Sequence, residues 1–181
     1  MIVPFSENEV LFERTIAIEA KIVRPSISNP GRNANTMGRA QVSGLLRDGF
    51  PFVGLVHISV PEPTPLHMHW EVPQISNSLG PNGELIETGE YHMFDPMPLL
   101  SAKRQEGRVL ALGLPVEVGY RVIAMTLSKG GEQFCGNTIG EVRIGARNPL
   151  VSNTVLKSVQ MLLTTEPYLF EVVHWYDQAD T

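Results

Sequence analysis

Residues 50–60 of the chain read FPFVGLVHISV, and the fold is predicted outward from this apolar run. Its apolar density is typical of a strand in the middle of a sheet. Successive side chains of a strand point to opposite faces, so Phe52, Val56 and Ile58 share one face while His57 falls on the other. We therefore predict a central strand that directs Phe52, Val56 and Ile58 into the core.

The segment before this strand predicts a second strand and a short helix. Residues 15–23 (TIAIEAKIV) alternate, which places Ile16, Ile18 and Ile22 on one face of a strand with period two. A proline two residues later stops the strand. Residues 36–46 then favour a helix, because capping side chains stand at its start and apolar residues recur at four-residue spacing.

The remainder of the chain alternates between turns and short periodic segments. Predicted strands cover residues 84–93, 107–114, 116–127 and 132–144. Residues 154–163 carry an apolar stripe with helical spacing, and residues 168–176 predict a closing strand. The predicted core comprises Ile16, Ile18, Ile22, Phe52, Val56, Ile58, Leu156, Val159 and Leu163.

Length and composition favour one compact domain. The chain has 181 residues, 43% of them apolar, with 14 prolines and 16 glycines that suit many short strands joined by turns. We predict the α+β class: a single β-rich domain with a mostly antiparallel sheet and one or two packed helices. Residues 1–9 are predicted to form a flexible apolar arm and residues 10–181 one globular domain.

Charge and cysteine content restrict the function classes. The net charge of −5 argues against a domain held to nucleic acid by bulk electrostatics, which needs a basic face. Cys135 is the only cysteine, so neither an intrachain disulfide nor a multi-cysteine zinc site can form. The N-terminal residues do not read as a signal peptide, and no apolar run has the length of a membrane-spanning helix.

The sharpest candidate for chemistry is the run His67-Met68-His69-Trp70-Glu71. On a strand, two imidazoles and a carboxylate at alternate positions share a face and could hold a metal ion. The segment partly resembles the first metal motif of cupins, but the second motif would need a later histidine that residues 114–120 lack. We predict that His67, His69 and Glu71 form the polar face of an amphipathic strand, with no metal, no cofactor and no catalytic residue.

The N-terminal arm is the predicted site of self-association. Ile2, Val3 and Phe5 are apolar side chains that are costly to leave in water, and Pro4 keeps the segment extended. We expect this arm to dock on a neighbouring copy. The predicted self-association residues are Ile2, Val3, Pro4 and Phe5.

Taken in order, these elements resemble the matrix proteins of rhabdoviruses. Residues 15–25 (TIAIEAKIVRP) match a strand ending near Arg-Pro, and residues 48–60 (DGFPFVGLVHISV) match an aromatic-rich Gly/Pro-Phe strand. Residues 116–127, 154–163 and 168–175 echo the closing elements. The chain lacks the lysine-rich N-terminal tail with which vertebrate members bind membrane, and the Pro-Pro-x-Tyr late motif with which they bud through host sorting factors. The resemblance therefore does not extend to these two mechanisms.

The resemblance implies a viral structural protein with a matrix-like domain that self-associates and packs against a nucleocapsid during virion assembly. The resemblance implies that the protein is not an enzyme and that it is located in the virion and the host cytoplasm. It also implies a membrane surface as a further partner and no binding of a specific nucleic-acid sequence. Two alternatives stay open at the level of sequence. One is a cupin-like metal-binding barrel, an enzyme in some forms, and the other is a viral jelly-roll capsid or movement-type protein.

Overall fold

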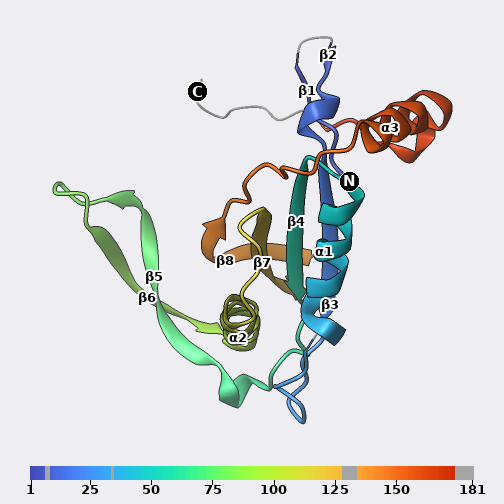
Figure 1. Ribbon diagram of the computed structural model, residues 1–181. Helices are drawn as coiled ribbons and strands as arrows, with labels where there is room; N and C mark the ends of the chain where they lie inside the picture. The colour runs from blue at the N-terminus through green and yellow to red at the C-terminus, as the bar shows by residue number, and fades with distance from the viewer. Residues whose placement is uncertain (7–8, 34, 128–133, 174–181) are drawn as a thin grey trace.

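The structure, a computed structural model, describes residues 1–6, 9–33, 35–127 and 134–173 (Figure 1). Its centre is a four-stranded sheet in the order β3-β4-β7-β8. The strands are β3 (Ile16–Val23), β4 (Phe52–Ser59), β7 (Val118–Leu127) and β8 (Phe134–Arg143). Strand β4 runs parallel to both β3 and β7, and β8 returns antiparallel to β7.

Two helices connect the parallel strands and cover one face of the sheet. Helix α1 (Arg39–Asp48), after a 3-10 turn at Asn35–Gly38, leads from β3 to β4, and α2 (Met97–Ala111) leads into β7. Val42 of α1 and Val109 of α2 are buried in the same cluster as the β4 and β7 side chains. Parallel strands joined in sheet order by crossovers of one hand place their helices on one side. The helices α1 and α2 therefore leave the opposite face uncovered.

A long hairpin is inserted between β4 and α2, after a 3-10 turn at Leu66–Met68. Strands β5 (Trp70–Leu79) and β6 (Leu85–Phe94) pair antiparallel along their length. Asp95 fastens the base of the hairpin, because its carboxylate accepts hydrogen bonds from the backbone N–H and the hydroxyl of Thr64 at 3.0 and 2.8 Å. From this base the hairpin runs away from the central sheet (Figure 1).

The N-terminal residues and the last helix meet at one end of the sheet (Figure 1). Two-residue strands β1 (Phe5–Ser6) and β2 (Glu9–Val10) pair with each other, and a 3-10 turn at Phe12–Arg14 follows. Helix α3 (Asn153–Thr165) packs on this turn and ends at a 3-10 turn, Pro167–Leu169.

The start of α3 is anchored to the loop between α1 and β4. Asn148 Nδ2 donates to the carbonyls of Leu46 and Phe50 at 2.8 and 2.9 Å, and Ser152 N donates to the Gly49 carbonyl. Gly49 has φ +95°, and a Cβ there would lie 2.7 Å from Ser152 N. A glycine is therefore required at this crossing both for its backbone conformation and for the close approach of α3.

The α+β class is confirmed, since three helices accompany a mixed central sheet and two small antiparallel sheets. The two parallel pairings within the central sheet are a feature that the sequence did not reveal. Strands β4, β6 and β8 follow the predicted segments within two residues, and α3 follows the predicted helix. The first helix, predicted over residues 36–46, begins three residues later, after a 3-10 turn.

Two predicted strands are wrong. Residues 107–114 were predicted as a strand but largely belong to α2, whose buried side is Ser101, Ala102, Gln105 and Val109. Because this stripe is small or polar, its helical period is hidden in hydropathy. The described part of the predicted strand over residues 168–176 contains a 3-10 turn and no strand, and residues 174–176 lie outside the described ranges.

The predicted core places the wrong face of the strands in the interior. The buried side chains of β4 are Val53, Leu55, His57 and Ser59, while Phe52, Val56 and Ile58 lie on the other face and are only partly buried. Of the predicted core, Val159 is buried, Leu156 and Leu163 are half-buried, and Ile22 is 54% exposed. Apolar residues occupy both parities of β4, so the pattern does not reveal which face the helices cover.

Candidate interaction surface

The face of the central sheet that α1 and α2 leave bare is a continuous apolar surface, which we name the open face. Its side chains come from alternate positions of β3, β4 and β7: Ile16, Ile18, Ala20, Ile22, Phe52, Val56, Ile58, Arg121, Ile123 and Met125, with Gly54 and Gly119 between them. None of these residues is buried. On the opposite parity, all four residues of β4 and the four of β7 from Val118 to Ala124 are buried.

The pairing register aligns the open face in rows across the sheet. Ile22, Ile58 and Ile123 are neighbours on β3, β4 and β7, and Ala20, Val56 and Arg121 form the next row. Arg121 is the only charged side chain that these three strands place on the face. A surface of aligned isoleucines with one cation at its side is apolar enough to gain free energy whenever it is covered.

The outer edge of β3 borders this face, and the N-terminal arm lies against its beginning. Ile2 and Ile16 exchange two backbone hydrogen bonds of 2.9 Å in an antiparallel bridge. Ile2 remains 51% exposed and Phe5 45% exposed, while Val3 and Pro4 are half-buried. Of the four predicted self-association residues, Ile2 thus lies at the border of the open face, whereas Phe5 pairs with Val10 in the β1–β2 ribbon.

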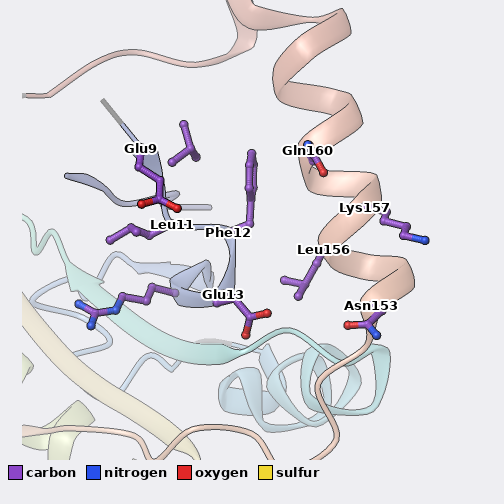
Figure 2. Close-up of a pocket in the computed structure, with 10 residues that line it drawn as sticks. Glu9, Leu11, Phe12, Glu13, Asn153, Leu156, Lys157 and Gln160 are labelled. Atoms are coloured by element: carbon purple, nitrogen blue, oxygen red, sulfur yellow. The ribbon is translucent and has the colours of Figure 1, made fainter. Parts of the chain in front are cut away.

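A pocket of about 370 Å³ lies between the Phe12–Arg14 turn and α3 (Figure 2). Phe12 and Leu156 occupy the space between the two elements, and Glu9, Glu13 and Lys157 are among the lining residues. Arg147 forms an exposed ion pair with Glu13, at 2.8 Å. The pocket is the seam where an amphipathic helix meets the N-terminal segment, with an apolar floor and charges around it.

A group of polar side chains is buried between the sheet and the helices. His57 is fully buried, and its Nε2 donates to the Met37 carbonyl at 3.0 Å. Burial lowers the pKa of His57 below its ordinary value, and the nearby Lys21 ammonium lowers it further, against the opposing effect of the Met37 hydrogen bond. The edge of Tyr120 packs against the imidazole with ring centroids 5.5 Å apart. Ser59 and Ser101 share a hydroxyl hydrogen bond of 2.6 Å.

These buried groups explain why polar residues occur on the helix-covered side of β4. Burial raises the pKa of Tyr120, and the Glu106 carboxylate adds to the rise. His57, Tyr120 and Gln105 are at most 3% exposed, so solutes in water have no access to them. We interpret the group as part of the core that holds α1 and α2 on the sheet.

The structure does not bring His67, His69 and Glu71 together as a group of metal ligands. His69 Nε2 donates to the Thr64 carbonyl at 3.0 Å, while His67 and Glu71 are exposed. His67 lies in the 3-10 turn before β5 rather than on a strand, so the alternation expected over residues 67–71 does not form. Among the described residues, no three His, Cys, Asp or Glu side chains form a group that could hold a metal ion.

A nucleophile pair would need a histidine beside the single cysteine, Cys135, but the backbone does not bring His57 to it. His57 lies on β4 opposite Val122 of β7, and Cys135 lies on β8 opposite Thr126. Strand β7 lies between these two strands, and along β7 the two partner positions, Val122 and Thr126, are four residues apart. Nothing in the described ranges forms a barrel, so the cupin-like alternative is not met by the fold, and the parallel central sheet is unlike a jelly roll.

The open face is the feature that reasoning from sequence missed. Its residues were identified as apolar and periodic but were assigned to the interior. A usable signal was present in the order of the elements, because a helix between two strands is typical of a parallel crossover, and two crossovers of one hand in sheet order cover only one face. Within the described ranges, no helix has both the length and the apolar character needed to cross a bilayer.

Comparison with known proteins gives no relative for this chain. No protein-family model, no curated protein and no solved structure matches it.

Proposed function

We propose that this protein is a structural protein rather than an enzyme and that it associates with itself through the open face. The observation that carries the proposal is the contrast between the two faces of one sheet. The helix-covered side of β4 and β7 is buried, whereas the isoleucine rows on the other side are not. A partly exposed apolar sheet face of this kind is typical of a surface that another molecule covers.

The dimensions of the open face suit a second copy of the chain. Its three strands overlap over about eight residues at about 3.3 Å per residue and lie about 4.8 Å apart, so the face spans about 26 by 14 Å, or about 370 Å² in projection. Side chains roughen this area, so two such faces stacked about 10 Å apart bury on the order of 1,000 Å² in total. That area is about the minimum for a specific interface, and a self-complementary pair of faces closes as a twofold dimer.

The role that such association serves comes from the resemblance to rhabdovirus matrix proteins. In that reading the chain is a matrix-like assembly unit of a virion, present there and in the host cytoplasm, with a nucleocapsid and a membrane surface as further partners. Ile2, Val3, Pro4 and Phe5 remain the proposed arm residues. Because Ile2 pairs with Ile16 at the border of the open face, the arm adds apolar area to the same association surface.

The test compares two substitutions of exposed apolar side chains. Ile22 on the open face is 54% exposed, and Met161 on α3 is 64% exposed. Ile22→Asp introduces two charges, one per copy, into an apolar interface that cannot solvate them. We expect sedimentation velocity to show association of the parent chain and of Met161→Asp, and an association constant at least tenfold lower for Ile22→Asp. Equal association of all three proteins would reject the open face as the interface.

A further inference from the structure

The β5–β6 hairpin carries an excess of negative charge, and in this subsection we name it the acidic arm, distinct from the N-terminal arm. Residues 70–94 contain four glutamates, Glu71, Glu84, Glu87 and Glu90, and no lysine, arginine or aspartate. All four are exposed. Because the whole chain has a net charge of −5, the arm holds four of the five excess negative charges. An otherwise nearly neutral body therefore carries one strongly negative projection.

The arm is also longer and more apolar than a free hairpin tolerates. Its ten-residue strands span about 33 Å at about 3.3 Å per residue. Leu79, Leu85 and Tyr91 are 62%, 69% and 59% exposed. A two-stranded ribbon is at best marginally stable in water without a surface to pack on. The chain itself does not supply that surface, since the arm points away from the body (Figure 1).

The complementary charge lies on the outer side of α2 and the loop that precedes α1. Lys103 and Arg104 are exposed on α2, and Arg32 is exposed on the loop. Three contacts hold this loop against the helix. Gln105 Nε2 donates to the Arg32 carbonyl at 3.0 Å, Arg108 donates to the Gly31 carbonyl at 3.3 Å, and the Arg104 guanidinium lies beside Gly31.

These contacts leave the positive charges of the cations without a carboxylate partner among the described residues. The three interactions use backbone carbonyls or a glycine rather than carboxylates, and none of the ion pairs found among the described residues involves Arg32, Lys103, Arg104 or Arg108. Glu62, from the connector that follows β4, is an acid that contacts this loop, where its Oε2 accepts from Ile27 N at 3.4 Å. The four cations, which we name the basic surface, outnumber it.

We propose that the acidic arm of one copy docks on the basic surface of a second copy. The inference rests on the proposed self-association and adds a second, different contact to it. Arm and basic surface are distinct patches, and we infer that each arm engages the next copy head-to-tail instead of being exchanged reciprocally within a pair, so that the contact does not close. Combined with a twofold contact at the open face, it extends dimers into larger arrays. Charge complementarity selects the register and speeds encounter, and the exposed leucines and Tyr91 supply burial.

The experiment uses charge reversal in the full chain. The arm variant is Glu87→Lys/Glu90→Lys, and the basic-surface variant is Lys103→Glu/Arg104→Glu. Matched controls reverse exposed charges elsewhere, Glu141→Lys/Glu171→Lys and Arg14→Glu/Arg47→Glu, with the same changes in net charge. Light scattering and negative-stain microscopy at low salt measure assembly beyond the dimer, and sedimentation velocity measures the dimer itself.

We expect each test variant to raise the protein concentration needed for arrays at least tenfold, and each control to change it less than threefold. An equal mixture of the two test variants should assemble again. The arm made positive in one variant then meets the α2 surface made negative in the other, and the two unchanged patches also have opposite charges. Dimers should persist throughout. Failure of the mixture to assemble, or equal losses in the controls, would overturn the arm contact while leaving the open face untouched.

A polyanion is the competing occupant of the basic surface. A fluorescent single-stranded oligonucleotide serves as the probe for it. Binding of the probe that is lost in Lys103→Glu/Arg104→Glu, together with arrays unaffected by Glu87→Lys/Glu90→Lys, would overturn the proposal in favour of nucleic acid. Loss of the dimer in Ile22→Asp is a separate result that bears only on the open face.

Discussion

Replacing Leu55 and Ile58 by alanine tests which face of β4 is the core. The two residues lie three positions apart on the same strand and therefore on opposite faces. Leu55 is 0% exposed and belongs to the buried cluster with Val42 and Tyr120, whereas Ile58 is only partly buried. Leu→Ala in a packed core costs about 2–5 kcal/mol because it removes contacts and leaves a cavity.

Leu55→Ala should therefore lose about 3 kcal/mol of unfolding free energy, which for a chain of this size lowers the melting temperature by roughly 6–12 °C. Ile58→Ala removes a half-covered side chain that leaves no closed cavity, and it should cost about 1 kcal/mol. Urea unfolding at protein concentrations where the dimer dissociates measures both values without the contribution of association. An Ile58→Ala loss equal to or larger than that of Leu55→Ala would refute the assignment of the two faces.

Three further predictions concern other parts of the fold. Burial and Lys21 keep the pKa of His57 below its ordinary value of about 6.5, so the unfolded chain binds a proton more readily than the folded chain. The free energy of unfolding should therefore be at its full value above pH 6.5 and fall as the pH drops below it. His57→Gln should weaken this fall, as measured by the urea midpoint at each pH. Gly49→Ala should cost more than 1 kcal/mol by thermal melting, because the left-handed backbone and Ser152 both oppose a Cβ. Val159→Asp places a charge at a site that is 5% exposed, and it should release α3 to limited proteolysis, whereas an intact α3 would show that the stripe does not pack inward.

The strands were readable from sequence where alternation and turn residues agree. Residues 15–23 alternate strictly, and the turn Gly80-Pro81-Asn82-Gly83 separates the two strands of the hairpin. Ser152 caps α3 as its position before an apolar stripe suggests, and its Oγ accepts from Val155 N. Local signals of this kind depend on neighbouring residues only, so they survive in a single sequence.

The faces of the sheet and the helix α2 depend on contacts between distant residues. His57 and Ser59 look like solvent-facing residues in the sequence, but in the interior the Met37 carbonyl accepts from His57 Nε2 and Ser101 shares a hydrogen bond with Ser59. Helix α2 buries small and polar side chains, so its period is visible only once the sheet is in place. The candidate surface was missed for the same reason, because its isoleucines are apolar on any reading and only the placement of the helices leaves them uncovered.

The central claim is that the open face is covered by a second copy of the chain. Isoleucine δ1-methyl NMR spectra recorded over a series of protein concentrations test it most directly, because no residue is changed. Association through this face predicts that the methyl signals of Ile22, Ile58 and Ile123 shift with concentration, while that of Ile139, which packs against the core opposite the buried Val122, stays fixed. Signals of the open face that do not move, or that shift no more than that of Ile139, would rule this contact out.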